Sequence, residues 1–197
     1  MIVVIDNKDS FTYNLIDYIK TETTLPLQVY EVDDVSMDKL SQLQIDAIVI
    51  SPGPGKPSDY PILKEVMQHY EGEIPILGVC LGFQFIFEYY GGRIIHGTKP
   101  IHGHTTRLNH SGTGIFKDLP QQFEVMRYHS LIADKATLPS QLQITAYNEE
   151  DIPMAIEHKS LPIYAVQYHP ESILSEYGHE QLRHFFSKVG LVNEYHI

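Results

Sequence analysis

The sequence predicts an α/β fold with a mostly parallel central sheet, because strand-like and helical patterns alternate along its first half. The run at residues 47–50 is wholly apolar, as expected for a central strand that is buried on both faces. Beyond Gly92, polar and apolar residues alternate between turn signals, which is typical of antiparallel strands. We therefore expect antiparallel strands added to the parallel sheet, and helices on both of its faces.

In the first half, each expected strand is followed by a helix. Ser10 is expected to cap the first helix, because its hydroxyl can accept a backbone N–H and apolar residues then recur at helical spacing. Pro61 suits the first turn of the third helix, and Gly91-Gly92 ends the fourth. The expected strands are residues 2–5, 27–32, 47–50 and 74–79, and the expected helices are 11–19, 37–43, 61–70 and 83–90.

In the second half, one amphipathic helix follows a series of short strands. Leu182, Phe185 and Phe186 give that last helix, at about residues 180–189, its apolar side. The strands are expected at residues 105–109, 123–127, 143–147, 154–157 and 163–168. No linker or low-complexity stretch interrupts the pattern, so one domain over residues 1–197 is expected.

Composition and charge narrow the possible functions. Of the 197 residues, 43% are hydrophobic, so the chain can bury a core without metal ions or disulfides. Fourteen Lys and Arg residues against 25 Asp and Glu residues give a net charge of −11, which repels phosphate backbones and anionic lipids. No apolar run approaches the roughly 18 residues of a membrane span. We expect no nucleic-acid partner and no membrane association.

The single cysteine and the N-terminus indicate a compartment. Cys80 has no second cysteine with which to form an intrachain disulfide, which is typical of a reducing environment. The chain starts with a strand-like run and lacks the basic, apolar and small-residue order of a secretory signal. A cytoplasmic location is expected.

Gly78-Val-Cys-Leu-Gly82 places Cys80 between a buried strand and a helix, with a glycine two residues away on each side. This is the thiol counterpart of the G-x-S-x-G nucleophile elbow, in which the flanking glycines avoid clashes at a sharp, strained turn. Backbone N–H groups and the helix dipole at a helix start favour a thiolate. An inert buried cysteine is the alternative, and the elbow makes Cys80 a candidate nucleophile instead.

A thiolate that attacks an amide needs an acid–base group, and a carboxylate commonly orients that group. Tyr168-His-Pro-Glu-Ser172 offers both at the end of an expected strand. Pro170 favours an extended His169, so the side chains of His169 and Glu171 are expected on the same side, about 6–7 Å apart along the chain. For this segment by itself, a turn histidine beside a solvated glutamate is the alternative.

Two further polar segments follow expected strands. Ser51-Pro-Gly-Pro-Gly55 lies where open α/β sheets place their ligand crevices, and its N–H groups, with that of Leu81, could form an oxyanion hole. By itself the segment is an ordinary rigid turn. Asp6 and Asp9 are expected to cap the following helix or to meet a partner subunit rather than to act as an acid–base pair.

Taken together, these segments resemble the class I, triad-type glutamine amidotransferases, and more closely the glutaminase subunits of anthranilate synthase and aminodeoxychorismate synthase. The resemblance covers nearly the whole chain. It is carried by Asp6-Asn-Lys-Asp-Ser-Phe-Thr-Tyr-Asn14, Ser51–Gly55, Gly78–Gly82 with Gln84, Arg127-Tyr-His-Ser-Leu131 and Gln167-Tyr-His-Pro-Glu-Ser-Ile-Leu174. It implies that Cys80 is the nucleophile, His169 the acid–base and Glu171 its orienter. The contacts to glutamine that it implies are Gly53, Pro54, Gly55, Gln84, Ser130 and Leu131.

The resemblance also implies a flavodoxin-like fold and hydrolysis of L-glutamine through a thioester on Cys80. It implies a chorismate-converting partner, component I, which uses the ammonia for para-aminobenzoate (folate) or anthranilate (tryptophan) synthesis. No cofactor is implied for this chain, and any Mg²⁺ requirement belongs to the partner subunit. Tyr177-Gly-His-Glu180 favours the aminodeoxychorismate branch, and service to both branches stays open.

Two positions depart from the family pattern. Phe83 stands where the family commonly has His after Cys-Leu-Gly, and we expect altered packing there because the position lies outside the triad. His102-Gly-His104 replaces the family's His-Gly-Lys, which removes the lysine available for a subunit contact. These histidines, with His96 and His110, lack a carboxylate or thiolate at metal-ligand spacing, so no metal site is expected.

Two other functions stay open. A γ-glutamyl hydrolase or a cysteine peptidase would use the same triad and sheet on another substrate. A regulatory subunit would keep the fold without the activity, although the intact Cys80, His169 and Glu171 argue against it.

Overall fold

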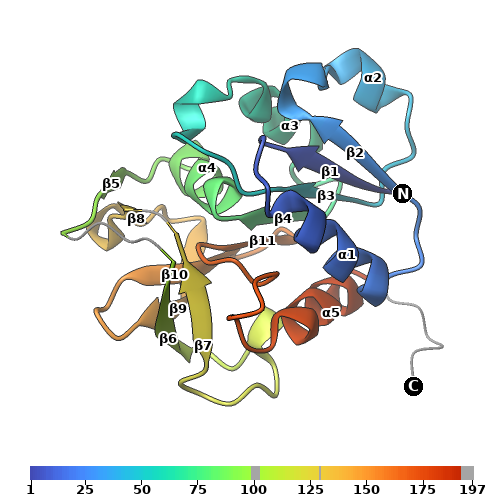
Figure 1. Ribbon diagram of the computed structural model, residues 1–197. Coiled ribbons are helices and arrows are strands. Elements are labelled where there is room, and N and C mark those ends of the chain that lie inside the picture. Colours follow the sequence, from blue (N-terminus) through green and yellow to red (C-terminus); the bar gives the residue numbers. More distant parts are fainter. Residues whose placement is uncertain (99–102, 129, 192–197) are drawn as a thin grey trace.

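The computed structural model describes residues 1–98, 103–128 and 130–191, and a nine-stranded sheet runs through that part of the chain (Figure 1). Its strand order is β2-β1-β3-β4-β11-β10-β9-β6-β7. The parallel strands are β2 (Leu27–Glu31), β1 (Ile2–Asp6), β3 (Ala47–Ile50), β4 (Ile76–Val79) and β11 (Ile163–Val166). The antiparallel strands are β10 (Pro153–His158), β9 (Leu142–Asn148), β6 (His104–His110) and β7 (Glu124–Arg127).

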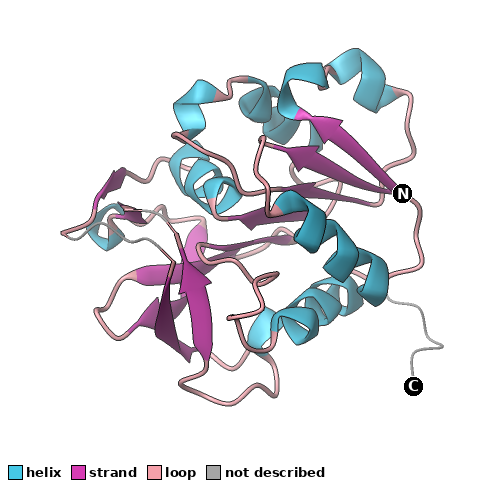
Figure 2. Cartoon of the chain, in the orientation of Figure 1, coloured by secondary structure: helices cyan, strands magenta, loops and turns pink. Residues whose placement is uncertain are grey.

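Helices cover both faces of the parallel half of the sheet (Figure 2). Helices α1 (Thr12–Glu22) and α5 (Gly178–Lys188) pack side by side on one face. The other face carries α2 (Met37–Ser41), α3 (Ile62–Tyr70) and α4 (Leu81–Tyr89). The 3₁₀ helices are η1 (Val32–Asp34), η2 (Pro57–Asp59), η3 (Gly114–Phe116) and η4 (Lys135–Thr137). Within the three described ranges, no helix combines the length and the apolar character that crossing a membrane requires.

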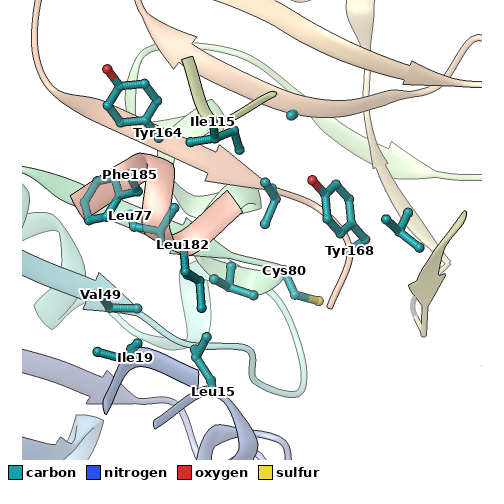
Figure 3. Packing of buried hydrophobic residues seen from close by; sticks show 14 of the residues in the cluster. Leu15, Ile19, Val49, Leu77, Cys80, Ile115, Tyr164, Tyr168, Leu182 and Phe185 are labelled. Atoms are coloured by element: carbon teal, nitrogen blue, oxygen red, sulfur yellow. The ribbon is translucent and has the colours of Figure 1, made fainter. Parts of the chain in front are cut away.

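Two hydrophobic clusters, one on each face, follow from the alternation of side chains along the strands. In β1, Ile2 and Val4 join the cluster under α1 and α5, whereas Val3 and Ile5 join the cluster under α3 and α4. Burying each such side chain fully stabilises the fold by roughly 1.5–3 kcal/mol relative to exposure. Cys80 belongs to the first cluster, so the thiol lies at the border of a packed core (Figure 3).

The fold class is as the sequence predicts, with antiparallel strands added to a parallel sheet and helices on both faces. One expectation is wrong. Helix α1 begins at Thr12 and its N-cap is Phe11, so Ser10 is not the cap. A short second sheet is an addition that the sequence patterns did not indicate, in which β5 (Ile94–His96) pairs with β8 (Leu131–Ala133).

Candidate active site

Cys80 lies between β4 and α4, at the carboxyl end of a strand with a parallel neighbour on each side. Its backbone has φ +56° and ψ −98°, a region that residues other than glycine rarely adopt. The conformation is held from both sides. The N–H of Cys80 donates to the carbonyl of Val166 at 2.8 Å, and its carbonyl accepts from the N–H of Gln84 at 3.1 Å. The strained turn presents the 6%-exposed cysteine at the start of α4.

The two glycines of the elbow are required by close backbone packing. A Cβ atom at Gly78 would lie 2.6 Å from the carbonyl carbon and oxygen of Gly82. A Cβ atom at Gly82 would lie 2.5 Å from the carbonyl oxygen of Ile50 in β3. Backbone atoms cannot rotate away as a flexible side chain can, so both glycines let α4 approach the sheet. The structure confirms the expected reason for the flanking glycines.

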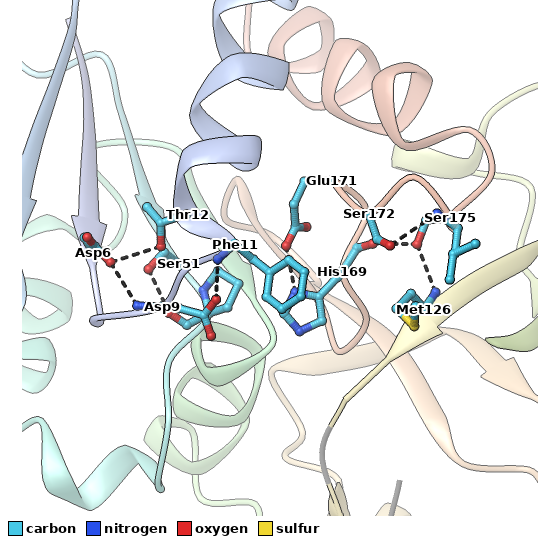
Figure 4. Close-up of polar contacts among 12 residues, drawn as sticks. Asp6, Asp9, Phe11, Thr12, Ser51, Met126, His169, Glu171, Ser172 and Ser175 are labelled. Carbon is cyan, nitrogen blue, oxygen red and sulfur yellow. Dashed lines mark hydrogen bonds and ion pairs between the residues drawn. The ribbon is translucent and has the colours of Figure 1, made fainter. Parts of the chain in front are cut away.

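His169 and Glu171 form a buried pair (Figure 4). Nδ1 of His169 lies 2.7 Å from Oε1 of Glu171, and the two side chains are 2% and 0% exposed. The intervening Pro170 places both side chains on one side of the chain, as the sequence predicts. Among the described residues, Oε2 of Glu171 has no hydrogen-bond partner, so this carboxylate acts on the imidazole through Oε1.

The structure brings Cys80 to the same imidazole. Burial by itself lowers the pKa of His169, but hydrogen bonds to Cys80 and Glu171, with the negative charges that both groups carry when ionised, raise it to about 10. Because Glu171 occupies Nδ1, Nε2 is the ring nitrogen left for the sulfur. At neutral pH the arrangement favours an imidazolium paired with a thiolate.

The backbone of His169 is fixed by strand β7 and by a serine. Its N–H donates to the carbonyl of Met126 at 3.0 Å in an isolated antiparallel bridge. Ser175 Oγ donates to the carbonyl of His169 and accepts from the N–H of Met126 at 2.9 Å. One residue earlier, the buried Tyr168 hydroxyl donates to Gln181 of α5. The histidine is therefore tied to both the sheet and a helix.

The loop after β3 lies against the first residue of α4. Asn7 and Ser51 fix its start: the N–H of Asn7 donates to Ser51 Oγ at 2.9 Å, and Nδ2 of Asn7 donates to the Ser51 carbonyl at 2.7 Å. A Cβ atom at Gly53 would lie 2.5 Å from Cβ of Asn7 and 3.1 Å from Leu81 Cδ2. Gly55 has φ +79°, and the carbonyl of Pro54 accepts from the Tyr60 hydroxyl at 2.7 Å. The loop is rigid and adjoins Leu81.

Gln84 is buried behind the elbow. Its Nε2 donates to Oε1 of Gln167 at 3.4 Å, and Gln167 Nε2 in turn donates to the carbonyl of Cys80 at 3.4 Å. Gln167 is a site residue to which the sequence patterns assigned no role, although its position before Tyr168-His169 was a usable signal. The two amides link the helix and the β11 end to the strained residue.

Ser130 and Leu131 lie at the start of β8, outside the nine-stranded sheet. The carbonyl of Ser130 accepts from the N–H of Gly97 at 2.7 Å, and Leu131 pairs with His96. Tyr128, two residues before Ser130, packs its ring against His169 with 5.4 Å between centroids. The segment therefore starts at the triad, and the contacts of Ser130 and Leu131 with glutamine stay a prediction.

The two acidic residues after β1 cap and shape the turn into α1. Oδ1 of Asp6 accepts from the N–H of Lys8 at 2.9 Å and from Thr12 Oγ1 at 3.0 Å. Oδ1 of Asp9 accepts from the N–H of Phe11 at 2.7 Å. The capping role that the sequence predicts is confirmed.

The departures from the family pattern have structural consequences at two positions. Phe83 is fully buried and stacks on Phe87 with 6.4 Å between ring centroids, so it fills the core on the α4 face. His104 begins β6, exposed and paired with Arg127, whereas His102 lies outside the described residues. Within the described ranges, no group of three His, Cys, Asp or Glu side chains is arranged to hold a metal ion.

Comparison with protein families accounts for the whole site. Residues 3–189 match the family model of glutamine amidotransferase class-I. The chain belongs to the class-I glutamine amidotransferase family. This family match covers all the elements that bear the elbow, the loop after β3 and the histidine–glutamate pair.

Similar glutamine amidotransferase chains occur alone and within longer proteins. Aminodeoxychorismate/anthranilate synthase component 2 of Bacillus subtilis is 44% identical over 185 residues, 94% of this chain and 95% of that one. Anthranilate synthase component 2 of Azospirillum brasilense is 43% identical over 188 residues, 95% of each chain. The multifunctional tryptophan biosynthesis protein of Schizosaccharomyces pombe is 44% identical over 94% of this chain. This chain spans only 25% of that protein, and between 25% and 52% of four longer relatives.

Solved structures agree on the fold. The crystal structure of a GMP synthase protein from Thermoplasma acidophilum superimposes with a TM-score of 0.83 over 96% of this chain and 93% of that one, at 24% identity. A glutamine amidotransferase from Thermotoga maritima gives 0.73 over 96% and 97%, at 16% identity. At these identities the likeness concerns the fold of the class-I amidotransferases.

Proposed function

We propose that this chain is a glutaminase subunit that hydrolyses L-glutamine through a thioester on Cys80 and passes ammonia to a chorismate-converting partner. The observation that carries the proposal is the convergence of Cys80, His169 and Glu171 at a strained strand-to-helix turn. Family membership and the component 2 relatives support the choice of glutamine as substrate.

The first half-reaction forms the thioester. The thiolate of Cys80 attacks the side-chain carbonyl carbon of glutamine, and the carbonyl oxygen becomes an oxyanion. N–H groups of the Gly53–Gly55 loop and of Leu81 stabilise that charge. The His169 imidazolium donates its proton to the amide nitrogen, the carbon–nitrogen bond breaks, and ammonia leaves. Gln84, Ser130 and Leu131 hold the rest of the glutamine in this proposal.

The second half-reaction restores the enzyme. His169, now neutral, takes a proton from a water molecule whose oxygen attacks the thioester carbonyl. The carbon–sulfur bond breaks, glutamate leaves, and the Cys80 thiolate again faces an imidazolium. Glu171 keeps Nδ1 protonated throughout, so that Nε2 both gives and takes the proton. These steps use no cofactor.

The partner is proposed to bind over the triad. Exposed apolar side chains lie beside it: Ile173 is 95% and Leu174 52% exposed shortly after Glu171, and Tyr13 is 74% exposed two residues after Phe11, whose ring packs on His169. Ammonia that leaves Cys80 must reach its acceptor without loss to water, so a partner that covers this apolar face serves the transfer. The component 2 names of the relatives imply a component I, which we propose converts chorismate. We place the complex in the cytoplasm, where the Cys80 thiol stays reduced.

The test is product formation by the complex of this chain with its chorismate-converting subunit. Cys80→Ala should abolish aromatic-amine formation from chorismate and glutamine, while formation from chorismate and an ammonium salt continues. Glutamine-dependent synthesis that survives Cys80→Ala would refute the mechanism. The amine that is formed identifies the branch, folate or tryptophan.

Free glutamine separates this proposal from the other hydrolases. Release of glutamate and ammonia from L-glutamine supports a glutaminase, whereas cleavage of γ-glutamyl peptides or proteins without glutamine turnover would support the γ-glutamyl hydrolase or peptidase alternative. A regulatory subunit would show neither activity.

A further inference from the structure

Two aromatic rings from distant parts of the chain pack against the imidazole of His169. The ring centroid of Phe11 lies 4.9 Å from that of His169 with the planes tilted by 50°, and that of Tyr128 lies 5.4 Å away with the planes perpendicular. Phe11 and Tyr128 also touch each other, with 4.9 Å between centroids. The three rings form one cluster, and Figure 4 shows Phe11 beside the imidazole.

The hydrogen bonds of His169 leave its ring one freedom. Met126 and Ser175 hold the backbone and Glu171 holds Nδ1, but the χ2 torsion of histidine is broad. A ring that rocks about the bond to Glu171 carries Nε2 away from Cys80. One tilted and one perpendicular neighbour oppose this motion from two directions, because aromatic pairs at these separations have preferred angles.

Phe11 is itself held by the carboxylates after β1. Asp9 accepts the N–H of Phe11 at 2.7 Å, while Asp6 accepts from Lys8 and from Thr12 on either side of that turn. The proposed steps of glutamine hydrolysis make no use of Asp6 and Asp9. Their hydrogen bonds keep the half-buried ring of Phe11 at a constant height over His169.

Tyr128 has an equally fixed support. It comes two residues after Met126, the residue of β7 that pairs with His169. A Cβ atom at Gly103 would lie 3.2 Å from Cε1 of Tyr128, so the ring also packs closely against the backbone there. The ring thus approaches the imidazole from the strand that already holds the histidine backbone.

We propose that Phe11 and Tyr128 are positioning residues that fix the imidazole plane of His169, so that Nε2 stays directed at Cys80. The proposal rests on the function given above for the triad. It predicts a defect in proton transfer and in the thiolate–imidazolium pair, and little change in glutamine binding.

Two readouts on the full chain test it. The first is kcat and KM for glutamine hydrolysis. The second is the rate at which iodoacetamide alkylates Cys80 between pH 7 and pH 9, which needs no glutamine. Phe11→Ala and Tyr128→Ala remove each ring, Tyr128→Phe keeps the ring without its hydroxyl, and Tyr30→Ala removes a half-buried ring from the edge strand β2 as a control.

We expect kcat to fall by about tenfold or more in both ring-removing variants, with KM within about twofold, since positioned acid–base groups typically contribute about 10²–10⁴-fold. Alkylation of the wild-type chain should vary little between pH 7 and pH 9, and in the two variants it should rise steeply with pH. Tyr128→Phe and Tyr30→Ala should behave as wild type. If Phe11→Ala does not fold, Phe11→Leu, which keeps the volume without a flat face, is measured in its place.

The proposal is overturned if the folded ring-removing variants keep wild-type kcat and a wild-type alkylation profile, or if the whole loss is in KM. A wild-type chain that alkylates as described but turns over no glutamine, by itself or with its partner, would refute the proposed function and leave the positioning result standing.

Discussion

The imidazole of His169 and the carboxylate of Glu171 meet at 2.7 Å in an almost solvent-free site. The contact joins two residues only two positions apart, and it fixes which nitrogen faces Cys80. The orientation of the acid–base group is therefore a local property of the His-Pro-Glu sequence. Its alignment with the thiol depends on the rest of the fold.

Replacing Glu171 by Gln should lower the pKa of His169 from about 10, because the variant loses a charge and weakens a hydrogen bond that raise it. We expect kcat for glutamine hydrolysis to fall by at least about tenfold. Titration of the imidazole by NMR measures the pKa shift directly. An unchanged pKa would contradict the pairing described here.

The stability of the protein should fall between pH 6.5 and pH 10 in a way that depends on His169. Its folded pKa of about 10 exceeds the unfolded value of 6.5, so the stabilisation is complete below about pH 6.5 and is lost as the pH rises through about 10. Thermal unfolding midpoints at pH 7 and pH 10 should differ more in the wild-type protein than in His169→Gln. Equal differences would show that other groups cause the loss.

Gly82→Ala should destabilise the fold by about 1–3 kcal/mol, because the new methyl group meets the carbonyl oxygen of Ile50. It should also slow alkylation of Cys80 by moving α4 off the sheet. Gly112→Ala is the matched control, since Gly112 has φ +73° and open space around it, and costs only the backbone strain of about 1 kcal/mol. Chemical denaturation curves compare the two variants, and equal costs would count against the close approach of α4.

Ile173→Asp and Leu174→Asp should weaken the complex with the chorismate-converting subunit by about tenfold or more, because each puts a charge into an apolar contact. Alkylation of Cys80 in the free chain should not change, since both side chains point to solvent. Sedimentation of the mixed subunits measures the association. Unaltered association in the double variant would place the partner on another face.

The sequence predicts the elbow and the histidine–glutamate pair because both are local. Gly78 and Gly82 flank Cys80 at fixed spacing, and Pro170 sets the direction of its neighbours, so the chemistry follows from residues close together in the chain. The α1 cap was wrong for a related reason: Ser10 has a suitable hydroxyl, but the Asp6 and Asp9 carboxylates take the N–H groups of that turn.

Contacts across the fold were beyond the sequence patterns. Phe11 and His169 are brought together only when α1 and the end of β11 meet at one sheet edge, and no periodicity encodes that contact. The link from Gln84 through Gln167 to Cys80 is equally non-local. Strands β5 and β8 are three residues each and only partly buried, so their alternation is too short to indicate a sheet.

The most direct measurement is mass spectrometry of the chain after acid quenching during glutamine turnover. The account predicts one γ-glutamyl group on the peptide that contains Cys80, which disappears when the sample is treated with hydroxylamine. Label on a different residue, or glutamate and ammonia produced at the wild-type rate by Cys80→Ala, would contradict it.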